Sequence, residues 1–188
     1  MERNRTADFI AFYKKFGIYI LLVAVCAFFS VAAPNFLSPT NLINILRQVS
    51  MFGIVVVGVA MVMIGGGMDL SVGGQMAVIG MIIGVMLVNW ELPIPVVVLA
   101  AMVFGVLFGM FNGIVAVKLK IMPIIVTLAT MLILQGVAYL ITGGYPITGM
   151  PKAFLMLGQG YIGIIPIPVI VFVAFILFGW VVMNKTYL

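Results

Sequence analysis

Charged residues divide this chain into six long apolar stretches. No Asp, Glu, Lys or Arg lies between positions 15 and 47, 47 and 69, 69 and 91, 91 and 118, 120 and 152, or 152 and 185. A helix needs about 20 apolar residues to cross the hydrocarbon of a bilayer, and the strict alternation typical of barrel strands is absent. The pattern predicts membrane-spanning helices at about residues 16–33, 43–64, 72–89, 96–117, 123–142 and 164–183.

Proline and glycine fill the intervals between these stretches, as expected where helices end. The longest interval, residues 143–163, is mixed in character, and we expect a short surface helix at about 152–157 within it. The prediction is therefore an all-α polytopic transmembrane helix bundle, with residues 1–188 forming a single transmembrane domain. The interval residues are Pro34, Pro39, Gly65, Gly66, Gly67, Pro93, Pro95, Pro123, Gly143, Gly144, Pro166 and Pro168.

Composition excludes a water-soluble fold. Hydrophobic residues make up 65% of the chain and charged residues 7%, with a mean hydropathy of +1.39, whereas soluble domains carry about 25% charged residues. The net charge of +5 would raise nucleic acid as a partner of a soluble protein, but basic residues also flank membrane helices. We therefore expect the lipid bilayer, and no nucleic acid, as a partner.

The distribution of cations predicts the orientation in the membrane. Two of the nine, Arg47 and Lys152, fall on one side of the predicted spans and seven on the other. Because the cytoplasmic side carries the excess of Lys and Arg, we expect the amino terminus and residues 65–71 in the cytoplasm, and the 143–163 interval outside. The chain is expected to cross the membrane several times. The cytoplasmic seven are Arg3, Arg5, Lys14, Lys15, Lys118, Lys120 and Lys185.

Several kinds of chemistry have no residues to support them. The chain has no His, and Cys26 is its only cysteine, so we expect no catalytic residues and no metal site. No lysine follows a glycine, which rules out a phosphate-binding loop of the G-x-x-x-x-G-K-S/T kind. The glycines at 158, 160 and 163 match G-x-G-x-x-G, but without a preceding strand we treat the match as chance. The first apolar stretch is longer than a signal-peptide core of about 7 to 15 residues, and we expect a retained anchor.

The interval at residues 65–74 holds five glycines and the only carboxylate near a predicted membrane core. Glycine allows a sharp turn and close backbone approach. Asp69 or Ser71 can cap the following helix, so one interpretation is an ordinary capped turn. The other is a narrow cytoplasmic constriction containing Asp69, Leu70, Ser71 and Gly73. Both remain open, since they are compatible.

The stretch at 96–117 carries small residues at steps of four. Gly105, Gly109 and Gly113 predict close packing against another helix, because small residues let helices approach in lipid. Asn112 lies beside this stripe. Its amide costs free energy in hydrocarbon unless it finds a polar partner or a hydrated cavity, so it is a candidate for the translocation path.

The stretch at 123–142 begins at Pro123, which suits the first turn of a helix. Thr127 and Thr130 share one face with Leu134. Their hydroxyls can bond to carbonyls of their own helix, which is a structural role, or can form a weakly polar wall along which a sugar moves. The sequence favours neither interpretation.

Taken in order, several motifs resemble the ribose, xylose and arabinose type permeases of ATP-binding-cassette importers, which belong to the binding-protein-dependent inner-membrane components. The resemblance covers essentially the whole chain. It is carried by Gly66-Gly67-Met68-Asp69-Leu70-Ser71-Val72-Gly73, Asn112-Gly113, Lys118-Leu119-Lys120-Ile121-Met122-Pro123, Ile125-Val126-Thr127-Leu128-Ala129-Thr130-Met131, Gly136, Gly143-Gly144, Pro146-Ile147 and Asn184-Lys185-Thr186.

The resemblance implies a permease subunit of the inner (plasma) membrane of a bacterium. Such a subunit translocates a monosaccharide and is not itself an enzyme. It implies a second permease subunit in a homo- or heterodimer, a cytoplasmic ATPase that binds ATP and Mg, and an extracytoplasmic sugar-binding protein; no cofactor is expected on this chain. Such permeases have about ten spans, so the chain resembles their amino-terminal part and is expected to be truncated at its carboxyl end. The implied inner gate comprises Asp69, Leu70, Ser71 and the turn from Lys120 to Pro123, with the 123–142 stretch lining the path.

Two other classes of protein were considered. An ion-coupled secondary transporter of a small polar solute also uses glycine-broken spans, but Asp69 is the only ionisable group available for coupling near a membrane core. An intramembrane enzyme would need an acid, a base or a metal site within the spans, and the spans contain no His, Cys pair or carboxylate pair.

Overall fold

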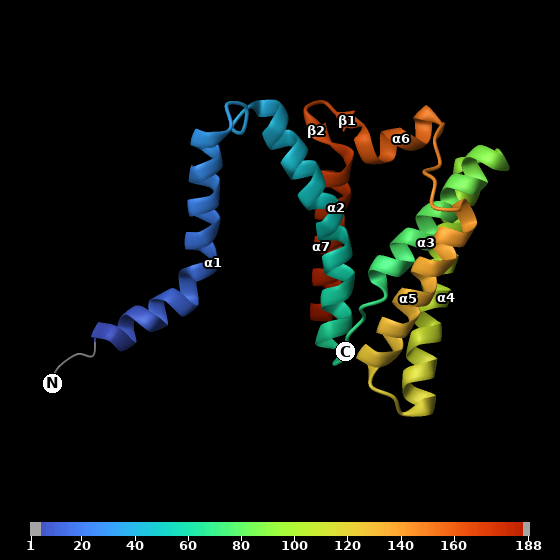
Figure 1. Ribbon diagram of the computed structural model, residues 1–188, viewed down its shortest axis with the longest axis horizontal. Helices are drawn as coiled ribbons and strands as arrows, with labels where there is room; N and C mark the ends of the chain where they lie inside the picture. The colour runs from blue at the N-terminus through green and yellow to red at the C-terminus, as the bar shows by residue number, and fades with distance from the viewer. Residues whose placement is uncertain (1–4, 186–188) are drawn as a thin grey trace. The chain divides into compact units, whose positions relative to one another are not determined.

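The computed structural model describes residues 5–185, with side chains from Phe12 to Lys185 (Figure 1). The side chains of Arg3 and Arg5, and the closing residues 186–188, lie outside this description. The helices are α1 (Arg5–Ala32), α2 (Pro39–Ile64), α3 (Val72–Gly84), the π-helical η1 (Val85–Asn89), α4 (Ile94–Leu119), α5 (Pro123–Thr142), α6 (Lys152–Gln159) and α7 (Ile167–Lys185). Two short strands, β1 (Tyr161–Ile162) and β2 (Ile165–Pro166), precede α7.

Six helices within the described residues are long and apolar enough to cross a membrane. They confirm the predicted all-α polytopic bundle, and their boundaries agree with the predicted spans within a few residues, except that α1 starts earlier. The short helix expected at 152–157 is also present, as α6. The six spans are Phe12–Ala32, Pro39–Ile64, Val72–Asn89, Ile94–Leu119, Pro123–Thr142 and Ile167–Lys185.

The sequence pattern did not predict the strands β1 and β2. They pair antiparallel through a two-residue turn that begins at Gly163, which has φ of +63°. Glycine adopts this left-handed conformation without a steric penalty. Strands of two residues are too short for alternating polarity to reveal them.

The chain divides into two compact units, Met1–Leu46 and Arg47–Leu188. The boundary falls inside the unbroken helix α2, and the expectation of a single domain stays a prediction. In the first unit α1 is joined to the start of α2 by a turn at residues 33–38. Ser38 caps α2, since its Oγ accepts the N–H of Asn41 at 3.3 Å, and Pro39 occupies the first helical position.

The second unit contains a group of three helices, α3, α4 and α5, that pack side by side (Figure 1). Gly74 of α3 sits against the backbone of Met131 in α5, where an added Cβ would lie 2.6 Å from the carbonyl oxygen. Val78, Leu134 and Ala138 form the buried cluster beside this contact. A close approach that only glycine allows therefore sets the spacing between α3 and α5.

In the same unit, α2 and α7 contact one another at two glycines. The ring of Phe172 occupies the space that a Cβ on Gly53 would need, and Val57 packs against Gly179 at 3.0 Å from the corresponding position. A second buried cluster, Met86, Leu87 and Val97, is covered by residues of the loop after α5 and of α6. The loop after α5 therefore packs against this buried cluster beside the three-helix group.

Candidate functional site

The loop at residues 65–71 joins α2 to α3. Gly66 has φ of +80°, and the N–H of Gly67 donates to the carbonyl of Val62 at 3.0 Å. These features satisfy the last carbonyls of α2 and turn the chain, as expected of a helix that ends on glycines. The predicted sharp turn is present.

Asp69 organises the start of α3. Its Oδ1 accepts hydrogen bonds from the backbone N–H of Ser71 at 2.8 Å and from the Ser71 hydroxyl at 2.6 Å. Ser71 holds the N-cap position, but its side chain makes no capping bond to the helix. The capping role considered for Ser71 is therefore wrong, because its hydroxyl is committed to other side chains. Of these two residues, only Asp69 accepts a backbone N–H with its side chain.

Ser71 is the junction of a polar network that joins three helices. Its Oγ, fully buried, accepts from Nδ2 of Asn112 in α4 at 2.8 Å and from Nε2 of Gln75 in α3 at 2.7 Å. Thr130 of α5 donates its hydroxyl to Oδ1 of Asn112 at 2.7 Å. Successive donations run from Thr130 through Asn112 and Ser71 to the carboxylate of Asp69. Asn112 and Thr130, 5% and 6% exposed, have thus found polar partners inside the protein.

Thr127 links the beginning of α5 to the 65–71 loop. Its Oγ1 donates to the carbonyl of Pro123 at 2.9 Å and accepts the backbone N–H of Leu70 at 3.2 Å. Bonding to its own helix and bonding to the loop therefore occur together. Thr127 is 4% exposed, so in this conformation its hydroxyl serves the loop and not a solvent-filled path.

Lys120 and Pro123 form the turn between α4 and α5. Lys120 has the left-handed conformation, φ +53° and ψ 36°, and ends α4, while Pro123 is the first residue of α5. The N–H of Ile121 donates to the carbonyl of Ala116 at 3.1 Å, which closes the end of α4. The Lys120 side chain is exposed. This turn stands at the same end of the three-helix group as Thr127 and the 65–71 loop.

A cavity of about 250 Å³ brings together four of the gate candidates, Asp69, Asn112, Pro123 and Thr127. It lies between the end of α2, the 65–71 loop, α4 and the start of α5, and its walls are largely apolar with a polar part at Asp69, Asn112 and Thr127. Its lining residues are Val62, Gly67, Met68, Asp69, Gly109, Asn112, Gly113, Ala116, Val117, Pro123 and Thr127.

The glycine stripe of α4 is not covered by another helix among the described residues. A Cβ added at Gly105, Gly109 or Gly113 would meet nothing within 4 Å. Gly109 and Gly113 instead border the cavity. Close packing of this stripe against another helix stays a prediction. A Cβ at Gly73 would also meet open space.

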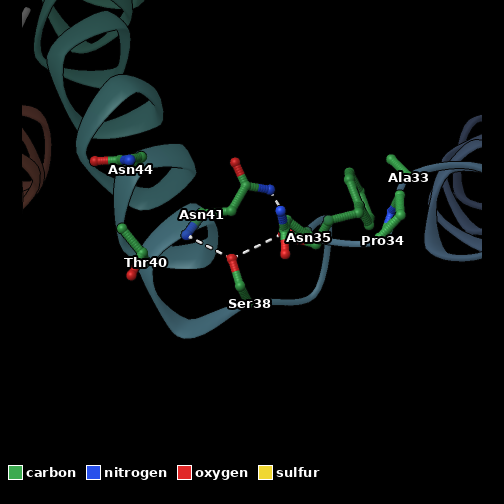
Figure 2. Close-up of a pocket in the computed structure, with 8 residues that line it drawn as sticks. Ala33, Pro34, Asn35, Ser38, Thr40, Asn41 and Asn44 are labelled. Carbon is green, nitrogen blue, oxygen red and sulfur yellow. Dashed lines mark hydrogen bonds between the residues drawn. The ribbon is translucent and has the colours of Figure 1, made fainter.

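Sequence reasoning missed Gln75, although its position four residues after Ser71 places both on one face of α3. It also missed a polar pocket of about 750 Å³ at the turn between α1 and α2, lined by residues of the 33–44 segment (Figure 2). There Ser38 Oγ donates to the carbonyl of Asn35 at 2.8 Å, and Asn41 Nδ2 donates to that of Phe36 at 2.7 Å. These groups hold the turn that starts α2.

Comparison with known proteins gives the family. A family model described as the permease component of the branched-chain amino acid transport system matches residues 41–188. The ribose import permease protein of Bacillus subtilis is 38% identical over 172 residues, which cover 90% of this chain and 52% of that protein. The ribose import permease protein of Haemophilus influenzae is 34% identical over 192 residues, 99% of this chain and 59% of that protein.

The galactose/methyl galactoside import permease protein of Escherichia coli is 33% identical over 204 residues, covering 99% of this chain and 61% of that protein. The chain thus spans between half and two thirds of the length of these relatives. No solved structure matches it significantly. Since the family match begins just inside α2 and includes the 65–71 loop, the cavity and every helix after them, this membrane-spanning chain belongs to the family of branched-chain amino acid transport system permease components.

Proposed function

We propose that this chain forms part of the permease of an ATP-driven importer that carries a monosaccharide across the cytoplasmic membrane. The observation that carries the proposal is the similarity, over 90% or more of the chain, to permeases named for ribose and galactose import. The relatives' names favour the importer over the ion-coupled carrier. They say nothing of which sugar this chain carries.

The lining of the cavity carries groups that suit a polar solute. Among the described residues that line it, Asp69 is charged and the others are neutral. Among its lining residues, Asp69 and Asn112 supply a carboxylate and an amide. These are the groups that exchange hydrogen bonds with the hydroxyls of a polyol.

The loop and the three-helix group act together as the inner gate. Thr127 ties Leu70 to α5, and Asn112 ties Ser71 to both α4 and α5. The loop is therefore held to the three helices by several hydrogen bonds in a region of low dielectric, where leaving them unmade is costly. Movement of this group relative to the end of α2, near Val62, would change the width of the cavity.

The gate faces the cytoplasm in this proposal, and the amino terminus lies on the same side. The turn that bears Lys118 and Lys120 lies at the same end of the three-helix group as Asp69, because Val117, Pro123 and Asp69 line one cavity. Cations concentrate on the cytoplasmic side of membrane proteins. The geometry and the cation count therefore support the same orientation.

The energy source and the solute delivery belong to partner proteins. We place ATP and Mg on a cytoplasmic ATPase and assign sugar capture to an extracytoplasmic binding protein, with a second permease subunit completing the path. No lysine of the given sequence follows a glycine, so these residues contain no phosphate-binding loop of the G-x-x-x-x-G-K-S/T kind.

Uptake of radiolabelled monosaccharides by cells that carry the complete transport system tests the proposal. Uptake is expected to stop when the ATPase is inactivated and to continue when a protonophore collapses the proton gradient and ATP is maintained. Uptake that stops when the proton gradient is collapsed, and continues when the ATPase is inactivated, would indicate an ion-coupled carrier and contradict the importer.

A further inference from the structure

The β1–β2 hairpin has one face toward the protein and one face away from it. Tyr161 pairs with Pro166, and Ile162 pairs with Ile165. Because side chains alternate across a strand, the two pairs point to opposite faces. On the first face Pro166 is buried and Tyr161 is 46% exposed, and on the second face Ile162 and Ile165 are 63% and 47% exposed. Ile164, at the tip, is 85% exposed.

The protein-facing side of the hairpin is fixed to α2. Nη2 of Arg47 donates a hydrogen bond to the hydroxyl of Tyr161, and the guanidinium carbon lies 4.9 Å from the centre of the Tyr161 ring. At the base of the hairpin, the N–H of Ile167 donates to the carbonyl of Gly160 at 3.0 Å. These contacts hold the hairpin in place, so that Ile162, Ile164 and Ile165 stay on its outward side.

The length of α7 sets the depth of the hairpin in the membrane. The helix starts at Ile167, directly after β2, and its 19 residues contain no charge before Lys185. At about 1.5 Å per residue the helix is roughly 28 Å long, close to the thickness of about 30 Å of the hydrocarbon layer. With Lys185 at one boundary of that layer, Ile167 and the hairpin stand at the other.

The composition of the hairpin suits this boundary. No charged residue occurs from position 153 to position 184, and the outward face and tip consist of isoleucines. Tyrosine, with an apolar ring and a polar hydroxyl, is enriched at the level of lipid headgroups. The hairpin also leads directly into α7, a helix that is long and apolar enough to cross a membrane.

We propose that the β1–β2 hairpin is a membrane-interface anchor. Its outward side chains, Ile162, Ile164 and Ile165, insert among the acyl chains of one leaflet beside α7. Tyr161 stays at the level of the headgroups, where it is bonded to Arg47. The occupant of the outward face is the bilayer. The anchor fixes the segment between α5 and α7 to the membrane surface, and the inference is independent of the solute that the protein carries.

Spin labelling of the protein, reconstituted in lipid nanodiscs, tests the anchor. A nitroxide is attached to Ile164→Cys in a Cys26→Ser background, and its collisions with oxygen and with a water-soluble nickel chelate are compared. Leu177→Cys, 58% exposed on α7, is the lipid reference, and Lys152→Cys, exposed at the start of α6, is the water reference. The ratio of oxygen to nickel collisions at position 164 is expected to shift from the Lys152 value toward the Leu177 value. A ratio equal to that at Lys152 would overturn the proposal.

A fluorescence measurement identifies what covers the tip. Ile164→Trp is placed in a Trp90→Phe and Trp180→Phe background, and its emission is quenched by lipids brominated on their acyl chains or by acrylamide in water. Strong quenching by the brominated lipids is the expected result. Protection from both quenchers would show that a second copy or another protein covers the tip, and strong quenching by acrylamide alone would place it in water. Either result rejects the anchor.

Discussion

Asn112 donates its amide to the hydroxyl of Ser71 at 2.8 Å, across 41 residues of sequence. The bond joins α4 to the residue that precedes α3, and Thr130 extends it to α5. Buried polar groups in a membrane protein stabilise only when they are paired. The three helices and the 65–71 loop are thus held as one body by polar contacts as well as by packing.

Replacing Asn112 with Leu is expected to destabilise the protein and impair uptake. The hydroxyls of Ser71 and Thr130 each lose a buried hydrogen-bond partner. This loss is expected to lower the free energy of unfolding by about 1–3 kcal/mol. Thermal unfolding in nanodiscs and sugar uptake in cells provide the two readouts. Gln135→Leu, an exposed amide on α5, is the matched control and is expected to change neither. Equal effects of the two variants would remove the special role of Asn112.

Asp69→Ala is expected to reduce transport more than it reduces assembly. The carboxylate accepts two bonds from Ser71, so its loss frees the 65–71 loop while the packing of α3 on α5 remains. Asp69→Asn keeps an oxygen acceptor and is expected to retain more activity. Immunoblots of membranes report assembly beside the uptake assay. If Asp69→Ala is instead lost from the membrane, Asp69 serves assembly as a capping residue and has no separate role in transport.

Two adjacent glycines of α3 are expected to respond in opposite ways to alanine. In Gly74→Ala the new Cβ meets the backbone of Met131, which cannot move without separating α3 from α5. In Gly73→Ala it meets open space, and alanine in a helix is more stable than glycine by about 0.5–1 kcal/mol. We expect a lower unfolding temperature for Gly74→Ala and an equal or higher one for Gly73→Ala. The reverse order would contradict the observed spacing of α3 and α5.

Thr127→Val preserves the shape of the side chain and removes its hydroxyl. The variant loses the bonds to Pro123 and Leu70, so the loop is released from α5, and we expect uptake to fall while the helices stay assembled. Thr127→Ser keeps the hydroxyl and is expected to recover most of the uptake. If Thr127→Val transports normally, the bond to Leu70 has no part in gating.

The sequence predicted the spans well and the contacts between them poorly. Apolar stretches and the glycines and prolines that end them are local features, so α2 to α5 were placed within a few residues. Asn112 was correctly singled out as an amide that needs a partner, but the identity of that partner depends on how α3 and α4 are rotated against each other, which no local pattern contains. The contact between Arg47 and Tyr161, 114 residues apart, was out of reach for the same reason.

Two-sided cysteine labelling tests most directly whether the 65–71 loop forms a cytoplasmic gate. Met68 lines the cavity and is 42% exposed, and Met68→Cys in a Cys26→Ser background is treated with a membrane-impermeant maleimide in vesicles of known orientation. Labelling is predicted in inside-out vesicles and not in right-side-out vesicles. Labelling from the outside alone would place the loop on the opposite face of the membrane and contradict the inner gate.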